Sequence, residues 1–282
     1  MFDKLSRSFA LLRASLAVLR ADKELLVFPL CSAIASLLVV ASFALPLFAS
    51  GALERLDAGE SPGVGTAIIA FLFYLTQYFV IFFFNSALVG AAMIRLNGGD
   101  PTVSDGFRIA FSRVGAILGY AAIAATVGLI LRMIEERAGF IGRWIAGLLG
   151  IAFTVATFLT VPILVSRGIG PIDAVKESAV LLKKTWGENV AGNVGLGLAF
   201  MLAYFLAIAG MFVLFYLVGA SGSATLIGAV IAISVVAFIA LALMHSALQG
   251  IYSAALYRYA SEGTVGGPFA DDLLQSAFRP KK

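Results

Sequence analysis

The chain has 282 residues, of which 61% are hydrophobic and 13% are charged, whereas about 25% of the residues of an ordinary soluble domain are charged. This composition excludes a soluble globular fold. The charged residues also leave long gaps, the longest of which covers residues 189–257 without any Asp, Glu, Lys or Arg. Such gaps are typical of membrane-spanning helices, each of which needs roughly 20 apolar residues.

The apolar runs predict an all-α, polytopic membrane bundle, with the whole chain (1–282) forming a single integral membrane domain. A β-barrel is the alternative, but it requires alternating polar and apolar residues, and runs such as Phe82–Phe84 do not alternate. The longest uncharged run is too long for one span, and the glycines and serines of 219–223 predict a turn within it. Pro162 predicts a kink in the fourth span. The six predicted spans are 25–49, 66–94, 114–131, 144–166, 190–218 and 224–257.

Amphipathic segments precede the first, third and fifth spans, at residues 2–22, 102–113 and 171–186. In each segment apolar residues recur at steps of three and four, which is typical of a helix that buries one face. We therefore expect three interfacial helices, each followed by a spanning hairpin, and a possible three-fold internal repeat. The alternative is that the amphipathic segments are ordinary loops of a polytopic protein.

The Lys and Arg residues predict the orientation of the chain. Sixteen of the 20 basic residues lie in the two termini and in the segments 95–113 and 167–188. Because basic loops stay in the cytoplasm, we expect both termini to be cytoplasmic. The net charge of +4 then describes a basic rim that attracts anionic lipid headgroups, by about 1 kcal/mol per nearby basic residue, and not a nucleic-acid-binding surface.

The fourth span and the segment after it carry a resemblance. Its motifs are Val161–Val165, Arg167–Ser178 and Trp186–Glu188, in which a proline-containing apolar run, a glycine-rich corner and an amphipathic helix ending in Trp-Gly follow one another. This pattern resembles uncharacterised prokaryotic six-helix membrane proteins of the domain-of-unknown-function type, akin to the membrane domain of some glycerophosphodiester phosphodiesterases. The resemblance implies a location in a prokaryotic inner membrane. It implies no activity, because the hydrolytic residues of those phosphodiesterases lie in a soluble domain that this sequence does not contain.

The candidate site is an intramembrane polar patch of Asn85, His245, Gln249 and Tyr252. Positions 245, 249 and 252 fall on one helical face, and Asn85 is expected at a similar depth on the second span. The patch could bind a proton, an ion or a polar headgroup. The alternative is interhelical hydrogen bonding, which contributes about 0.6 kcal/mol per bond on average. A proton relay normally includes an intramembrane Asp or Glu, and the predicted spans contain neither.

No sequence motif predicts catalysis, a metal site or a cofactor. The sequence contains no phosphate-binding glycine loop and no nucleophile–base motif, and the single cysteine, Cys31, cannot form a disulfide within the chain. We therefore expect a non-catalytic structural or accessory subunit that binds lipids or another membrane component, with a membrane protein partner or a homo-oligomer possible. The alternative is a transporter or channel for a hydrophobic or lipid-like solute, and an enzyme acting on lipid ranks third.

Overall fold

The computed structural model describes residues 2–49, 64–137, 139–219, 223–263 and 269, and their side chains except at 2–9, 184–196 and 198. The described residues are almost entirely helical, so the predicted all-α class is confirmed. Residues 50–63, between the first two predicted spans, and most of the C-terminal segment lie outside this part of the chain. The helices are α1 (Phe2–Ala21), the 3-10 helix η1 (Lys23–Leu26), α2 (Val27–Ala49), α4 (Val64–Leu96), α5 (Val103–Ser112), α6 (Val114–Arg137), α7 (Gly139–Ala156), α8 (Thr160–Arg167), α9 (Pro171–Gly219) and α10 (Ala224–Glu262).

Six helical segments among the described residues are long and apolar enough to cross a membrane. The chain is therefore a multi-pass membrane protein. Each segment overlaps one of the six predicted spans, because uncharged apolar runs of this length fix where such helices lie. The segments are Lys23–Ala49, Val64–Leu96, Val114–Arg137, Gly139–Arg167, Ala199–Gly219 and Ala224–Glu262.

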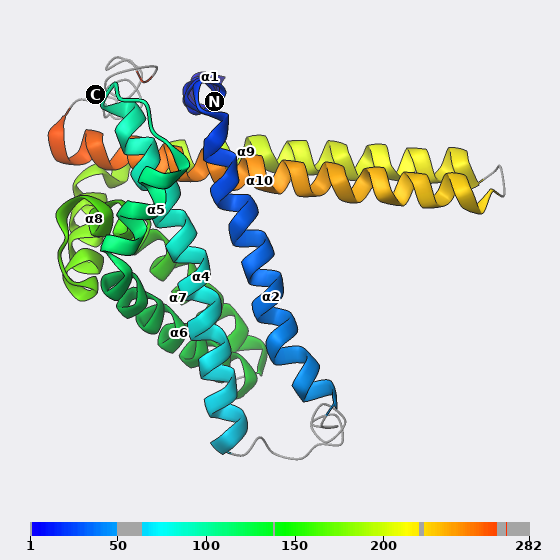
Figure 1. Cartoon of the computed structure of the whole chain (residues 1–282), viewed down its shortest axis with the longest axis horizontal. Coiled ribbons are helices and arrows are strands. Elements are labelled where there is room, and N and C mark those ends of the chain that lie inside the picture. Colours follow the sequence, from blue (N-terminus) through cyan, green and yellow to red (C-terminus); the bar gives the residue numbers. More distant parts are fainter. Residues whose placement is uncertain (1, 50–63, 138, 220–222, 264–268, 270–282) are drawn as a thin grey trace.

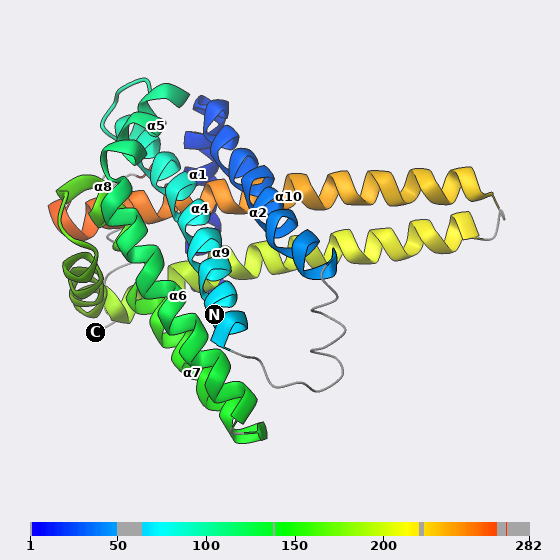
Figure 2. The same ribbon diagram turned by 60° about the horizontal axis from the view of Figure 1, so that its bottom comes forward.

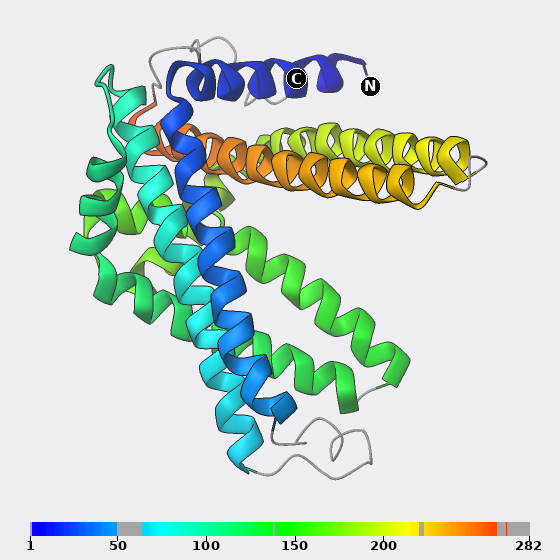
Figure 3. The same cartoon turned by 45° about the vertical axis from the view of Figure 1, so that its right-hand side comes forward.

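Four of the apolar helices run together, and two lie across them (Figures 1 and 2). Helices α2, α4, α6 and α7 form the bundle, with α4 in contact with α2, α5, α6, α8 and α10. Helices α9 and α10 pair into a hairpin that crosses one end of this bundle and extends well beyond it. Helix α1 packs on α9 and α10 at the same end, as Figure 3 shows. The core therefore sits where the bundle and the hairpin cross.

Aromatic rings join α2, α4 and α5 near this crossing. Phe28 stands edge-on to Phe107, with ring centroids 5.4 Å apart, and Phe83 lies 4.9 Å from Phe111 in the same way. Edge-to-face pairs of this kind contribute about 0.5–1.5 kcal/mol beyond the burial of their surface. Gly106 allows α5 to approach so closely, because a Cβ at this position would lie 2.8 Å from the backbone oxygen of Ala87.

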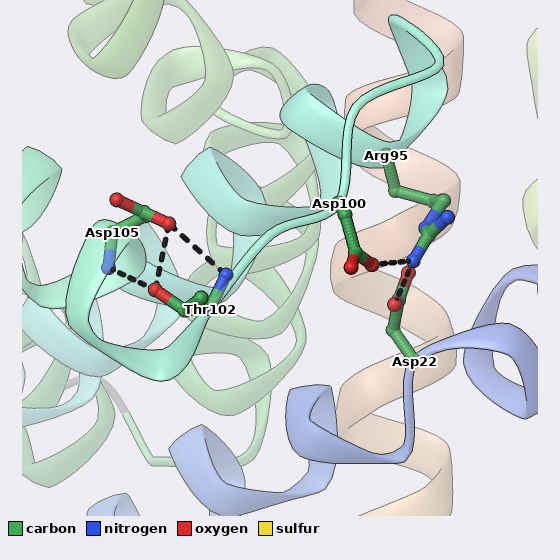
Figure 4. A network of polar contacts seen from close by, with 5 residues as sticks. All are labelled: Asp22, Arg95, Asp100, Thr102 and Asp105. Atoms are coloured by element: carbon green, nitrogen blue, oxygen red, sulfur yellow. Dashed lines mark hydrogen bonds and ion pairs between the residues drawn. The ribbon is translucent and has the colours of Figure 1, made fainter.

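A polar network holds the helix ends beside the crossing (Figure 4). The guanidinium of Arg95, at the end of α4, donates two hydrogen bonds to the carboxylate of Asp22, between α1 and η1. Its Nη2 atom also donates to Asp100, at 2.5 Å. Asp22 is buried, with 6% of its side chain exposed, whereas Asp100 is 92% exposed. The α1–α2 junction is therefore anchored on α4. We call this end of the molecule, which carries Arg20, Lys23, Arg95, Arg113 and Arg258, the basic face.

Helix α5 begins with a capping box near this network (Figure 4). The Asp105 amide donates to the Thr102 hydroxyl, and the Thr102 amide and hydroxyl donate to the Asp105 carboxylate, at 3.1 and 2.6 Å. These bonds from Thr102 hold the pKa of Asp105 below its usual value. A capping box satisfies backbone donors that would otherwise have no partner in the first turn, so the short α5 begins at a fixed point.

The predicted kink at Pro162 is a complete break between α7 and α8. Proline has no backbone N–H for the carbonyl four residues earlier, and its ring clashes with that carbonyl. The chain therefore forms a turn at Thr157–Leu159. The buried hydroxyl of Ser178, on α9, fills the break: it accepts a hydrogen bond from the Leu159 amide at 3.1 Å and donates to the Ala156 carbonyl at 2.7 Å.

We expect Ser178→Ala to lower the free energy of unfolding by about 1–2 kcal/mol, because a buried backbone group left without its partner costs about 1–3 kcal/mol. Equilibrium unfolding in mixed micelles with increasing SDS would measure the change. Ser42→Ala is the control, since Ser42 donates only to a carbonyl of its own helix on an exposed surface. Equal losses in both variants would contradict a role for Ser178 in closing the break.

The third interfacial helix differs from the prediction in one respect. A boundary was expected between 171–186 and the span that follows, as occurs at Asp22 after α1 and at Arg113 after α5. Instead α9 is continuous from Pro171 to Gly219. Gly187 weakens the helix at the expected boundary, but one glycine costs only about 1 kcal/mol relative to alanine. The Trp186–Glu188 side chains lie outside the described ones.

Candidate functional site

A cleft of about 260 Å³ lies where α10 crosses α2 and α4. Pro29 and Ser32 line it from α2, and Ile81, Phe84, Asn85 and Leu88 line it from α4. Ser246, Gln249, Gly250 and Ser253 line it from α10, and Phe158 lines it from the turn after α7. Its volume is slightly below the roughly 300–1,000 Å³ of sites that enclose a drug-sized ligand, so it can enclose only a small group or part of a larger molecule.

Gly250 shapes the back of this cleft. A Cβ at this position would lie 3.0 Å from Leu88 Cγ, closer still to Leu88 Cδ2, and 3.4 Å from Asn85 Oδ1. Because glycine has no side chain, α10 and α4 can cross closely here, as small residues allow between membrane helices. The Asn85 amide consequently lies directly beside the backbone of α10.

The cleft combines apolar walls with uncharged polar groups. Asn85 is half-buried and Gln249 is exposed at the cleft, and neither side chain has a hydrogen-bond partner among the described residues. The Ser253 hydroxyl is already used, because it donates to the Gly250 carbonyl at 2.8 Å. No residue lining the cleft carries a formal charge. The two amides can each both donate and accept hydrogen bonds.

The structure brings Asn85 and Gln249 together but places His245 elsewhere. The His245 ring stacks on Phe200 of α9, with ring centroids 4.2 Å apart and planes 15° apart. The cleft-lining residues of α10 centre roughly a quarter turn around the helix from His245, at 3.6 residues per turn. The predicted grouping of His245 with Asn85 in one polar patch is therefore not what the structure contains.

Tyr252 lies in the core and does not line the cleft. Its side chain is fully buried, its ring lies 6.2 Å from that of Phe158, and its hydroxyl has no hydrogen-bond partner among the described residues. It shares the face of His245, because positions seven apart nearly coincide on a helix. Of the four predicted patch residues, the cleft therefore contains two.

The sequence interpretation did not include three serines of the cleft: Ser32, Ser246 and Ser253. The available signal was the spacing of Ser246, Gln249 and Ser253 at steps of three and four, which places three polar groups on one face of α10. Ser32 carries no comparable signal, because it lies on a different helix, α2, and the sequence does not show that α2 contacts this face of α10.

The arrangement suits hydrogen bonding rather than metal binding. Among the described residues, no group of three or more His, Cys, Asp or Glu side chains lies close enough to hold a metal ion. Two amides and several hydroxyls in an apolar cleft can bind neutral polar atoms such as ester carbonyls or hydroxyl groups.

No curated protein matches this chain. Its sequence does match a family of unknown function, DUF6159, over residues 64–267. The matched region begins with α4 and runs through α10, so it includes the α4 and α10 walls of the cleft, while α2 precedes it. The match covers well over half of the chain, and the protein therefore belongs to the family of unknown function DUF6159.

Proposed function

We propose that this protein is a non-catalytic structural or accessory protein of a prokaryotic inner membrane that holds a membrane lipid in the cleft between α2, α4 and α10. The observation that carries the proposal is the pair of unpaired amides, Asn85 and Gln249, in a cleft without charged residues. Polar groups inside a membrane protein normally pair with one another. Unpaired amides on an apolar cleft instead fit the ester or hydroxyl groups of a lipid.

The basic face supports a second lipid contact. Its exposed cations include Arg20 of α1 and Lys23 of η1. With this face in the cytoplasm, as the distribution of basic residues favours, these side chains attract anionic headgroups at about 1 kcal/mol each. The cleft then selects a lipid through neutral groups, while the rim gathers anionic lipids without selecting among them.

Native mass spectrometry of the protein released from nanodiscs made of its own membrane tests the proposal. The wild type is expected to retain one lipid, and Asn85→Leu combined with Gln249→Leu is expected to weaken its binding about tenfold. The loss of two hydrogen bonds at roughly 0.5–1.5 kcal/mol each gives this factor, since 1.4 kcal/mol corresponds to tenfold. His245→Leu is the matched control, because His245 lies in the same helix but outside the cleft.

Equal lipid retention in the double variant and the wild type would contradict the lipid site. A reproducible extra polypeptide mass would instead favour a protein partner as the component bound. The alternative function, transport of a lipid-like solute, predicts flux into proteoliposomes that the double variant abolishes while its unfolding midpoint stays at the wild-type value.

A further inference from the structure

The third helical unit of the chain is built differently from the first two. After α1 the chain turns at Asp22 into α2, and after α5 it turns at Arg113 into α6. No such turn interrupts α9 between Pro171 and Gly219. At 1.5 Å per residue its 49 residues extend roughly 73 Å, more than twice the roughly 30 Å of a membrane core. The amphipathic start of α9 and its apolar end therefore lie along one continuous helix.

The hairpin of α9 and α10 forms a single layer across the bundle. In Figure 1 both helices lie at the same level, and in Figure 2 they separate into two parallel rods. A layer one helix thick measures about 10–12 Å with its side chains. That thickness fits within one leaflet, which is half of the roughly 30 Å core.

Contacts with α4 place this layer at a defined depth. Gly250 of α10 packs against Leu88 of α4, and Leu88 lies seven residues before Arg95 at the basic face. Seven residues of helix correspond to roughly 10 Å. At this crossing α10 therefore lies roughly 10 Å from the basic face along α4, a depth that falls within one half of the roughly 30 Å hydrocarbon core.

The outer part of the hairpin is apolar on every side. On α9, Phe212, Val213 and Leu214 are consecutive and 44–65% exposed, and Tyr216 is 81% exposed. Exposed large apolar residues continue along α10, where Val236 is 66% exposed. A helix that is hydrophobic all round is surrounded by lipid or by protein. A docked protein would account for one face of the hairpin, whereas acyl chains account for all of them.

We propose that the apolar outer part of the α9–α10 hairpin, Ala199–Gly219 of α9 and the first half of α10, lies in the plane of the membrane within the leaflet on the basic side, in contact with its acyl chains, while α2, α4, α6 and the α7–α8 segment cross the bilayer. The distribution of basic residues is compatible with this topology, because 219–223 contains no Lys or Arg and so gives no orientation signal. The inference does not depend on a lipid in the cleft.

Cysteine labelling in the full chain tests the proposal. In a Cys31→Ala background, Ala224→Cys marks the start of α10, and Phe140→Cys marks the opposite end of the bundle, where the side chain is 72% exposed. A membrane-impermeant maleimide added on the side of residue 140 is expected to label F140C and to leave A224C unmodified. Labelling of A224C from that side would overturn the proposal, because it is the result that a spanning α10 requires.

Electron paramagnetic resonance of nitroxides at Ile231→Cys and Ile239→Cys gives an independent depth. Both positions are about half exposed on α10. In reconstituted vesicles, an in-plane helix predicts similar depths at the two sites, with collisions with oxygen exceeding those with an aqueous nickel chelate. A spanning helix predicts depths that differ by roughly 12 Å over eight residues and would overturn the proposal. Protection from both oxygen and nickel would also overturn it, by assigning the surface to a protein partner.

Discussion

The variant Asp22→Asn is expected to lose about 2–3 kcal/mol of its free energy of unfolding. Breaking a buried ion pair by removing one partner costs roughly 3–5 kcal/mol. The Asp22 carboxylate is buried, but the Arg95 side chain is 27% exposed and keeps its bond to Asp100. Solvent and the second carboxylate therefore reduce the loss below the fully buried range.

The matched control removes the charge of Asp100, the second carboxylate that Arg95 contacts. Asp100 is 92% exposed, and exposed pairs contribute a median of about 0–1 kcal/mol. Asp100→Asn should therefore leave the SDS unfolding midpoint close to that of the wild type. Equal shifts in the two variants would mean that burial of Asp22 does not decide the strength of this contact.

The Asp22 pair also has a structural consequence beyond stability. Asp22 lies at the turn between α1 and η1, and Arg95 lies in the last turn of α4. Without the pair, α1 keeps its apolar contacts with the hairpin but loses its fixed position on α4. Hydrogen exchange in Asp22→Asn should therefore increase around residues 20–26 before it increases in the middle of α4.

The positions of the apolar helices could be predicted from the sequence because a long apolar run without charges has few stable structures other than a helix in a membrane. Helix α6 begins at Val114, the residue at which the third span was expected. The break near Pro162 was also predictable, since proline removes one backbone donor. What closes the break was not predictable, because Ser178 lies on another helix, and its place in the Arg167–Ser178 motif does not reveal which backbone groups it contacts.

The direction of the hairpin and the set of residues that line the cleft both depend on how the helices cross. The sequence of a single helix does not determine that crossing. Gln249 and His245 are four residues apart and share a face by spacing, yet Gln249 lines the cleft and His245 stacks on Phe200. The close approach of α10 to α4 at Gly250 decides this division. A pattern along α10 alone can identify polar positions but cannot show which neighbouring helix each of them contacts.

Gly106, where α5 packs against the backbone of α4, gives the second large expected effect. A Cβ at Gly106 would lie 2.8 Å from the carbonyl oxygen of Ala87 and closer still to the ring of Phe28. We expect Gly106→Val to lower the free energy of unfolding by about 3 kcal/mol, the upper end of the range for overpacking. The backbone of α4 cannot rotate away as a flexible side chain would, so α5 has to move.

Gly147→Val separates this clash from the general cost of valine in a helix. Gly147 lies on α7 with no atom within 4 Å of the added Cβ, and exposed substitutions usually change stability by less than about 0.5 kcal/mol. SDS unfolding should therefore distinguish the two variants clearly, and Gly106→Ala should lie between them. If Gly106→Val unfolded like Gly147→Val, α5 would not be packed against α4 at the distance described. Because Phe107 and Phe111 on α5 contact Phe28 and Phe83, displacement of α5 would also open the aromatic core beside the crossing of α4 and α10.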